Sequence, residues 1–500
     1  MNIFPCNENW VRGKYMKQKW ASWIVAVAML LSLTGFSHSA KAEVASNVSL
    51  DDSIKKIVEQ KLAGGDVSIS IRDRATGELL YNYNGEMPIK PASNMKLLTT
   101  AAALEVLGED YRFTTSLYTS GKLKNGVLKG DVYLKGEGDP TLSVEDLQQF
   151  AQELKAKGIT KIDGRIVGDD KWFDDDLLTP GIWEGDESYY YAAPISALTT
   201  SPNSDYDSGT IIVDVAGSAI GQAPTFQATP HLGDLEIINQ AVTVEAGKSN
   251  TVTIERSYRT NQIVISGNLP IDKTKREWVT VQHPTTHTLT MFEAILAEAG
   301  IEYTKGKLFR AATPKSADLV AMKKSMPLDQ LLIPYMKLSN NGIADILIKT
   351  MGKVENHHGS TKAGLKIVNK FGKSIGLQMN DWSFEDGSGI SHANNVSSMA
   401  VSDLLFKVQS EDWFPTFFTS MPVAGHPDRM VGGTIRNRLK DPLTAGKVFA
   451  KTGSLTGVNA LSGYLEGSSG QQYIFSVLVQ NKSGAATAID EIVLTMAREL

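Results

Sequence analysis

The chain has 500 residues, of which 50 are Lys or Arg and 55 are Asp or Glu, giving a formal net charge of −5. This acidic balance, without any long basic block, makes nucleic acid a poor candidate ligand. The one cysteine is Cys6, so the rest of the chain has neither a disulfide nor a thiolate for catalysis or metal binding.

The N-terminal segment has the order of residues that is typical of an exported protein. Four basic residues precede the apolar run Trp20–Leu33, and the small residues of Ala40-Lys41-Ala42 follow it. This order predicts a signal peptide over residues 1–42. Because the apolar run is shorter than the roughly 20 residues of a membrane span, we expect an exported protein with no stable membrane anchor. An uncleaved anchor is the alternative.

The next part of the chain predicts a hairpin and then an apolar helix. Val67–Arg72 alternates in polarity and is rich in β-branched residues, a Gly-containing turn follows, and Leu79–Tyr83 returns. Asn94–Leu107 is rich in Leu and Ala and ends at Gly108. We expect a helix there, with Ser93 at its N-terminus and Gly108 just past its end.

From Tyr111 to Asp272 the pattern changes to short alternating runs separated by Gly, Asp and Asn. This stretch predicts strands, with one helix at Val144–Lys157. A helical pattern returns from Thr288. The chain then closes with predicted strands and a last helix that packs on their sheet, namely Val448–Lys451, Leu461–Leu465, Tyr473–Val479 and Ala488–Leu500.

Three short motifs lie on or beside these predicted helices and strands. Ser93 and Lys96 form an S-x-x-K at the start of the apolar helix, Ser339-Asn340-Asn341 is an S-x-N, and Lys451-Thr452-Gly453 ends a predicted strand. Each motif alone arises by chance, and the simplest interpretation of Ser93 alone is a helix cap. Their order and their placement on these elements favour a shared catalytic site.

The chemistry of the first motif explains its spacing. Residues three apart share one face of a helix, so the Lys96 amine can reach the Ser93 hydroxyl. Serine is a weak nucleophile without a base, and a buried lysine serves as one if burial and a second cation, here Lys451, lower its pKa. The backbone N–H groups of Ser93 and Ser454 would stabilise the oxyanion, and Gly453 would let the strand edge approach the substrate.

The other motif residues have roles that follow from their chemical groups. Lys451 and Thr452 are suited to bind a substrate carboxylate. The Ser339 hydroxyl can relay a proton to the leaving amine, and the Asn341 side chain can hold the substrate amide.

Eight stretches extend these motifs across the chain, and in them the sequence resembles the class C low-molecular-mass penicillin-binding proteins, the D-alanyl-D-alanine carboxypeptidase/endopeptidase family. The stretches are Pro91–Thr99, Gly136–Leu142, Gly164–Asp170, Ala193–Leu198, Met336–Asn341, Asp386–Ser391, Pro422–Gly425 and Ala450–Leu455.

The resemblance implies an α+β fold with a penicillin-recognising serine transpeptidase-like catalytic domain, an antiparallel sheet with helices, built from residues 43–110 and 273–500. Residues 111–272 would be a β-rich insertion of two smaller domains beside the cleft. It further implies carboxypeptidase and DD-endopeptidase activity through an acyl-enzyme on the stem peptides of cell-wall peptidoglycan. β-Lactam antibiotics would be covalent inhibitors, and no cofactor or metal is expected.

The resemblance also implies a pocket for the free end of the peptide side chain. Matching by motif places Trp183, Asp186 and Tyr191 there, with Asp186 facing a distal ammonium. His392 stands where some relatives carry Arg, so it would bind a distal carboxylate best when protonated. A polar cleft wall is the alternative interpretation for all four residues.

Several other polar residues have simpler interpretations. His357-His358 is expected in a solvated loop, because no acidic or His partner lies at ligand spacing. The acidic pair Asp169-Asp170 and the acidic triplet Asp174-Asp175-Asp176 are expected on a polar loop rim. Asp386-Gly387-Ser388-Gly389 predicts a tight turn, and its contact with substrate is left open.

Two other functions compete with the peptidase. A β-lactamase shares the nucleophile but also needs a base that positions water for fast deacylation, and the sequence offers no glutamate at a recognisable spacing. A non-catalytic wall-binding protein could use the same scaffold, although all the motif residues are present.

Overall fold

The computed structural model describes residues 39–230, 233, 235–303 and 308–500. The predicted signal peptide lies outside these residues except for its last four, which begin helix α1 (Ser39–Lys61). No helix in the described part of the chain is long and apolar enough to cross a membrane.

One antiparallel five-stranded sheet joins the two ends of the chain, in the order β2-β1-β24-β23-β22. The predicted N-terminal hairpin and C-terminal strands are confirmed, and they pair with each other because β1 lies beside β24. The bounds are β1 (Asp66–Asp73), β2 (Leu79–Tyr83), β22 (Val448–Leu455), β23 (Val458–Glu466) and β24 (Gln472–Gln480).

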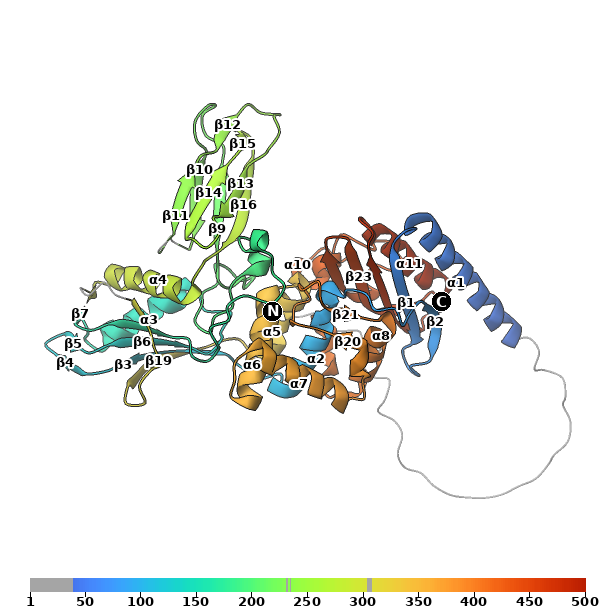
Figure 1. The fold of residues 1–500 in the computed structure, drawn as a ribbon, viewed down its shortest axis with the longest axis horizontal. Coiled ribbons are helices and arrows are strands. Elements are labelled where there is room, and N and C mark those ends of the chain that lie inside the picture. The colour runs from blue at the N-terminus through green and yellow to red at the C-terminus, as the bar shows by residue number, and fades with distance from the viewer. Residues whose placement is uncertain (1–38, 231–232, 234, 304–307) are drawn as a thin grey trace, which may run out of the picture.

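The last helix, α11 (Ala486–Glu499), covers one face of this sheet together with α1 (Figure 1). The apolar stripe of α11 is buried against the sheet, as the sequence predicted. Its residues form a core with α1, including Ile54, Val58, Ile489, Ile492 and Met496.

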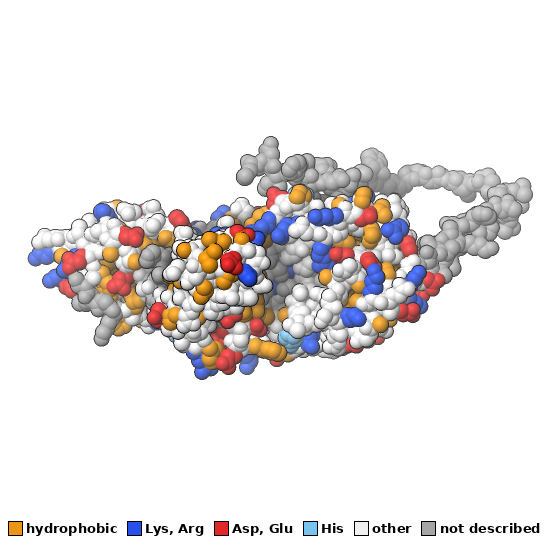
Figure 2. Space-filling model, turned by 90° about the horizontal axis from the view of Figure 1, so that it is seen from above, with side chains coloured by type: hydrophobic (Ala, Val, Ile, Leu, Met, Phe, Trp, Pro, Cys, Tyr) orange, Lys and Arg blue, Asp and Glu red, His pale blue; other side chains and the backbone are white. Residues whose placement is uncertain are grey.

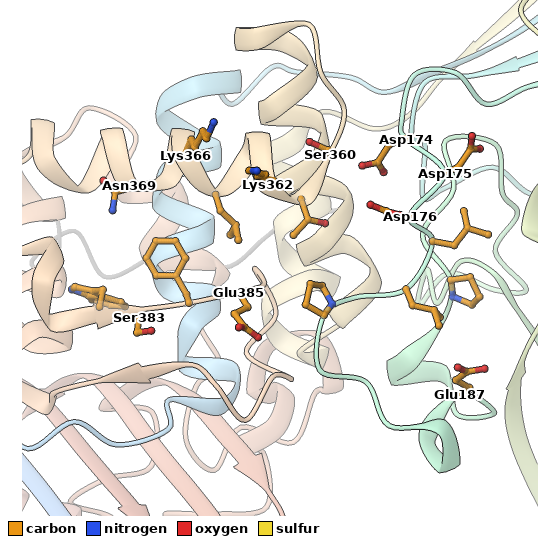
Figure 3. Close-up of a pocket in the computed structure, with 18 of the residues that line it drawn as sticks. Asp174, Asp175, Asp176, Glu187, Ser360, Lys362, Lys366, Asn369, Ser383 and Glu385 are labelled. Atoms are coloured by element: carbon orange, nitrogen blue, oxygen red, sulfur yellow. The ribbon is translucent and has the colours of Figure 1, made fainter.

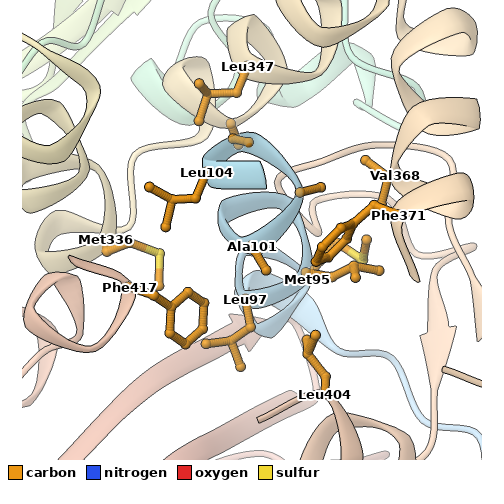
Figure 4. Packing of buried hydrophobic residues seen from close by; sticks show 14 of the residues in the cluster. Met95, Leu97, Ala101, Leu104, Met336, Leu347, Val368, Phe371, Leu404 and Phe417 are labelled. Carbon is orange, nitrogen blue, oxygen red and sulfur yellow. The ribbon is translucent and has the colours of Figure 1, made fainter. Parts of the chain in front are cut away.

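Helix α2 (Met95–Leu107) runs through the centre of the larger core on the other side of the sheet (Figure 4). Every residue from Met95 to Leu104 is buried, so α2 is a helix that is apolar nearly all round because it is surrounded. The surrounding helices are α5 (Leu328–Leu338), α6 (Asn341–Asn356), α7 (Thr361–Ser374), α8 (Ser398–Lys407) and α9 (Phe414–Ser420).

Between α2 and α5 the chain builds two β-rich parts. The first has a five-stranded sheet, β18-β8-β6-β3-β19, and a four-stranded sheet, β17-β7-β5-β4, covered by α3 (Val144–Ala156) and α4 (Pro284–Glu298). Its strands are β3 (Thr114–Thr119), β4 (Lys122–Lys124), β5 (Val127–Lys129), β6 (Val132–Gly136), β7 (Lys161–Ile162), β8 (Ile166–Asp169), β17 (Glu302–Tyr303), β18 (Leu308–Arg310) and β19 (Asp318–Lys324).

The second part projects from the body of the molecule (Figure 1), and apolar side chains gather on its end in the view of Figure 2. Its exposed apolar residues include Ile220, Val242 and Ile271. It has a small core of its own between short sheets. Its strands are β9 (Thr210–Ala216), β10 (Thr225–Thr229), β11 (Glu236–Asn239), β12 (Val242–Val244), β13 (Thr253–Arg256), β14 (Gln262–Ser266), β15 (Asn268–Pro270) and β16 (Thr274–Thr280).

The predicted end of the inserted region at residue 272 falls too early for this topology. Strand β19, which ends at Lys324, pairs with β3, and α4 packs in the same core as α3. The residue pattern of the sequence becomes helical at α4. Such a pattern predicts a helix but does not show which hydrophobic core the helix joins. We propose to place the insertion between the end of α2 and the start of α5.

The contact between α6 and α7 depends on the absence of a side chain at Gly364. A Cβ atom there would lie 1.9 Å from the Ile348 carbonyl oxygen of α6. Gly364→Ala must therefore separate the helices, and overpacking of this kind costs about 1–3 kcal/mol. We expect a lower midpoint in chemical denaturation, whereas Lys370→Ala on the exposed face of α7 should change stability by less than about 0.5 kcal/mol. Equal midpoints for the two variants would contradict this packing.

Candidate active site

Ser93 lies in a single 3-10 turn, η2 (Ala92–Asn94), and α2 begins only at Met95 with Asn94 as its N-cap. The predicted helix is thus confirmed, with Gly108 as its C-cap, but Ser93 precedes its first turn. Buried Ala92 has a φ of 46°. A Cβ at Gly389 would lie 1.8 Å from the Ala92 carbonyl oxygen, so the glycine lets a second turn pack directly on the serine turn.

The amine of Lys96 is wholly buried and has three oxygen acceptors. Its Nζ atom lies 2.8 Å from Ser93 Oγ, 2.7 Å from Asn341 Oδ1 and 2.7 Å from the Ser388 carbonyl oxygen. The predicted Ser93–Lys96 pair is therefore formed. The other two acceptors come from α6 and from the turn at Asp386–Gly389, so three separate parts of the chain hold this amine.

Two buried lysines of the site, Lys96 and Lys451, both have lowered pKa values. Burial lowers the pKa of Lys96 to about 7 against the opposing charges of Asp345 and Asp386. Burial, with repulsion from Lys96, holds the pKa of Lys451 well below its usual value. The sequence analysis named burial and the Lys451 charge as the causes of a low Lys96 pKa, and burial is the largest cause in the structure. A lysine with a pKa near 7 is partly neutral at neutral pH and can accept a proton.

The S-x-N motif lies at the junction of two helices. Ser339 caps α5 in the left-handed conformation, with a φ of 63°, and Lys451 Nζ lies 2.7 Å from its Oγ. Asn341 opens α6 and donates from Nδ2 to the Tyr191 carbonyl oxygen at 2.9 Å. Since its Oδ1 accepts from Lys96, Asn341 keeps one N–H for a substrate amide.

The middle residue, Asn340, has a role that the sequence did not indicate. Its Oδ1 accepts from the Ile343 N–H and caps α6. Its Nδ2 donates to the Asp205 carbonyl, the Tyr206 carbonyl and the Asp207 carboxylate. A buried amide that is fully bonded in this way ties the start of α6 to the inserted region.

The K-T-G motif lies on β22, which is the edge strand of the main sheet. Asn94 Nδ2 donates to the Lys451 carbonyl oxygen at 3.1 Å, and Thr452 Oγ1 donates to Thr434 Oγ1 at 2.8 Å. A Cβ at Gly453 would lie 2.6 Å from the Pro91 carbonyl oxygen. Gly453 therefore makes room for the turn that carries Ser93, and its part in letting the strand edge approach the substrate stays a prediction.

A cavity of about 640 Å³ brings together most of the predicted site residues. The cavity is not lined by Lys96, Lys451 or Gly453, which are buried behind its wall. The predicted residues that line it are Ser93, Trp183, Asp186, Tyr191, Ser339, Asn341, His392, Thr452 and Ser454. Thr434 also lines it and was missed in the sequence, where nothing distinguishes it from other threonines.

The four predicted pocket residues lie together at this cavity. The Trp183 ring stacks on His392 with 6.0 Å between ring centroids. Tyr191 donates from its hydroxyl to Asp186 Oδ1 at 3.0 Å, and its ring stacks on Tyr189. The result is an aromatic surface with one carboxylate, which suits an alkyl chain that ends in an ammonium.

Two buried carboxylates lie near Lys96; the sequence analysis missed Asp345 and considered Asp386 only as part of a turn. Asp386 accepts hydrogen bonds from the N–H groups of Gly389 and Ser391 and so closes the turn that the sequence predicted. Asp345 accepts from Thr179 Oγ1 at 2.9 Å and from the Gly387 N–H at 3.1 Å. The four-residue spacing from Asn341 to Asp345 was a usable signal, because such residues share a helix face.

A larger groove of about 1370 Å³ lies beside this cavity but contains none of the predicted catalytic residues (Figure 3). The acidic triplet forms part of its rim, as expected, opposite Lys362 and Lys366 of α7. Asp174 pairs with Lys349 and Asp175 with Arg310. Within the described ranges, no three His, Cys, Asp or Glu residues lie close enough to hold a metal ion.

The fold is shared with a solved structure, penicillin binding protein 4 (dacB) from Haemophilus influenzae. The TM-score is 0.76 at 25% sequence identity, covering 88% of this chain and 98% of that one. This is the α+β fold of the penicillin-recognising serine peptidases, as the sequence predicted.

Residues 49–499 match the model of the D-Ala-D-Ala carboxypeptidase 3 (S13) family, and the chain belongs to this family. It is 39% identical over 474 residues to a D-alanyl-D-alanine carboxypeptidase from Actinomadura sp., covering 93% of this chain and 88% of that protein. It is 27% identical over 444 residues to DacB of H. influenzae, covering 88% and 89%. The chain is thus a serine-type D-Ala-D-Ala carboxypeptidase, and the predicted resemblance is confirmed.

Because the Asn340 side chain bonds both α6 and the loop at residues 205–207, removing it should destabilise the inserted region as well as α6. Removing an N-cap side chain alone costs about 0.5–2 kcal/mol. We expect Asn340→Ala to cost about 1 kcal/mol more than that, and to speed amide hydrogen exchange over residues 203–207. Ser397→Ala is the matched control, because Ser397 caps α8 through the Ala400 N–H. Equal destabilisation and exchange in both variants would contradict the link.

Proposed function

We propose that Ser93 is the nucleophile of this carboxypeptidase and that it forms an acyl-enzyme with the penultimate D-alanine of a stem peptide. The observation that carries the proposal is the 2.8 Å contact between Ser93 Oγ and the buried amine of Lys96. The neutral amine takes the hydroxyl proton as Oγ bonds to the carbonyl carbon. Backbone N–H groups of Ser93 and Ser454 stabilise the negative oxygen that develops.

The C–N bond of the tetrahedral intermediate then breaks, and the leaving amine takes a proton through Ser339. Lys451, bonded to the Ser339 hydroxyl at 2.7 Å, supplies or returns that proton. Water next attacks the ester on Ser93 and releases the shortened peptide. The carboxylate of the terminal D-alanine docks at Thr452, with Thr434 beside it, while the Lys451 charge acts from behind the cavity wall.

Endopeptidase activity follows from the same chemistry. A cross-link between two stem peptides is also an amide of D-alanine, so its cleavage gives the same acyl-enzyme with a larger leaving amine. We propose that the enzyme cleaves such cross-links as well as terminal D-alanine, and that it reaches the cell wall by export through residues 1–42.

Covalent inhibition by β-lactams is part of the proposal. The strained ring amide would acylate Ser93 as the peptide does, and the name of the H. influenzae relative, penicillin binding protein 4, supports this. A β-lactamase is the second candidate. Among the described residues that line the cavity, Asp186 is the one carboxylate, and it is bonded to Tyr191. The lack of a free carboxylate base beside Ser93 favours slow deacylation and therefore the peptidase.

Ser93→Ala should abolish both D-alanine release and covalent labelling by a fluorescent penicillin, because no other group can form the ester. The measurement is gel fluorescence together with mass mapping of the labelled peptide. Ser383→Ala, an exposed serine of the neighbouring groove, should label normally. Labelling that persists in Ser93→Ala would disprove the assignment of the nucleophile.

Asp186→Ala should lower kcat/KM about tenfold, or roughly 1.4 kcal/mol, for peptides with a free distal amine. Such a loss fits a partly desolvated, charge-assisted pair. Peptides acetylated at that amine should change little, and so should penicillin acylation. Glu184→Ala is the control, since Glu184 lies on the same short helix, η3 (Glu184–Asp186), without lining the cavity. Equal losses on both peptides would leave Asp186 as part of a polar wall.

A further inference from the structure

Helix α6 has a stripe of three polar residues on one side, Asn341, Asp345 and Lys349. Their spacing of four places them on one face of the helix. Asp345 and Lys349 are each only 2% exposed. Because a buried charge without partners costs several kcal/mol, the sequence of α6 requires that other parts of the chain meet this stripe.

All three residues of the stripe bind one segment of the inserted region, residues 174–191, which we call the anchored segment. Lys349 Nζ lies 2.6 Å from Asp174 Oδ1, Thr179 Oγ1 donates to Asp345 Oδ2 at 2.9 Å, and Asn341 Nδ2 donates to the Tyr191 carbonyl at 2.9 Å. The segment contains only short 3-10 turns, so these bonds attach it to α6 at three points. Trp183 and Asp186 lie between the second and third bonds.

The same stripe also holds the surroundings of Lys96. Asp345 uses its other oxygen, Oδ1, to accept from the Gly387 N–H at 3.1 Å. Thr99 of α2 donates to the Gly387 carbonyl at 2.7 Å. The next carbonyl, that of Ser388, and the Asn341 side chain are two of the three acceptors of the Lys96 amine.

We propose that Asp345 is a positioning residue that ties the anchored segment, and with it the substrate side-chain pocket, to the catalytic amine of Lys96. The inference rests on the proposed roles of Ser93 and Lys96. The Asp345 carboxylate accepts a hydrogen bond from Thr179 with one oxygen and from the Gly387 N–H with the other. A shift of the anchored segment therefore moves the turn whose Ser388 carbonyl holds the Lys96 amine. The coupling therefore acts on the acylation rate more than on substrate affinity.

The charges around Lys96 give the proposal a second readout. Lys96 faces the carboxylates of Asp345 on α6 and Asp386 in the turn, and the buried amine of Lys451 on β22, whose own pKa is held well below its usual value. Asp345 raises the pKa of Lys96, while burial and Asp386 raise the pKa of Asp345 itself to about 7. Removing the Asp345 charge should therefore lower the pKa of Lys96, so that the amine becomes neutral at lower pH. Because the neutral amine is the base, the acidic limb of the pH–rate profile should also move to lower pH.

The test uses two nearly isosteric variants of the full chain, Thr179→Val and Asp345→Asn. Thr288→Val is the matched control, because the Thr288 hydroxyl is buried without a hydrogen-bond partner among the described residues. The measurements are kcat and KM for D-alanine release, and the second-order rate of labelling by a fluorescent penicillin across pH. Thermal melting verifies that each variant is folded.

We expect Thr179→Val to lower kcat about tenfold, with KM within twofold of the wild type and melting close to that of the control. We expect Asp345→Asn to move the acidic limb of the labelling profile to lower pH. A kcat for Thr179→Val equal to that of the control would overturn the proposal. If Asp345→Asn instead lowered the labelling rate at every pH without moving the acidic limb of the profile, the proposal would also be overturned, and Asp345 would have only a structural role.

These outcomes are distinct from failure of the proposed function. In every variant the mass-mapped penicillin adduct should lie on Ser93, because Thr179 and Asp345 do not touch the reacting atoms. An adduct on another residue would overturn the proposed nucleophile and this inference with it. An adduct on Ser93 with unchanged kinetics would overturn the inference alone.

Discussion

The buried amine of Lys96 is the constraint on which the rest of the site depends. An ammonium or amine without exposed surface must find its hydrogen bonds inside the protein, since losing them costs several kcal/mol. Here the three acceptors come from the serine turn, from α6 and from the turn at Asp386–Gly389. These parts of the chain lie far apart in sequence, so the amine is placed only when all of them have packed.

The packing around α2 explains how this placement is stable. Helix α2 is enclosed by five helices and the main sheet, so its first turn has little freedom to move (Figure 4). Two glycines, Gly453 on β22 and Gly389 in the turn at Asp386–Gly389, then let the backbone pack directly against the turn that carries Ser93. Close packing without side chains in between sets the distances of the site more rigidly than flexible side chains could.

The inserted region belongs to the site because α6 binds it directly. Asn340 bonds the loop at Asp205–Asp207, and the stripe of Asn341, Asp345 and Lys349 bonds the anchored segment. The cavity is therefore formed by two parts of the chain that share one polar seam. Such a seam is costly unless every member is paired, which favours one arrangement of the two parts over all others.

The sequence by itself determined the secondary structure around the motifs and the identity of the Ser93–Lys96 pair, because these depend on local periodicity, caps and fixed spacing. Its resemblance to a known family implied the α+β class. It also placed Trp183, Asp186, Tyr191 and His392 at one pocket through resemblance. Only the tertiary structure decided which core α4 and β19 join, what packs against Gly453, and the bonds that Asp345 and Asn340 make. These depend on which surfaces meet, and contacts between residues more than a hundred positions apart leave no periodic trace in the sequence.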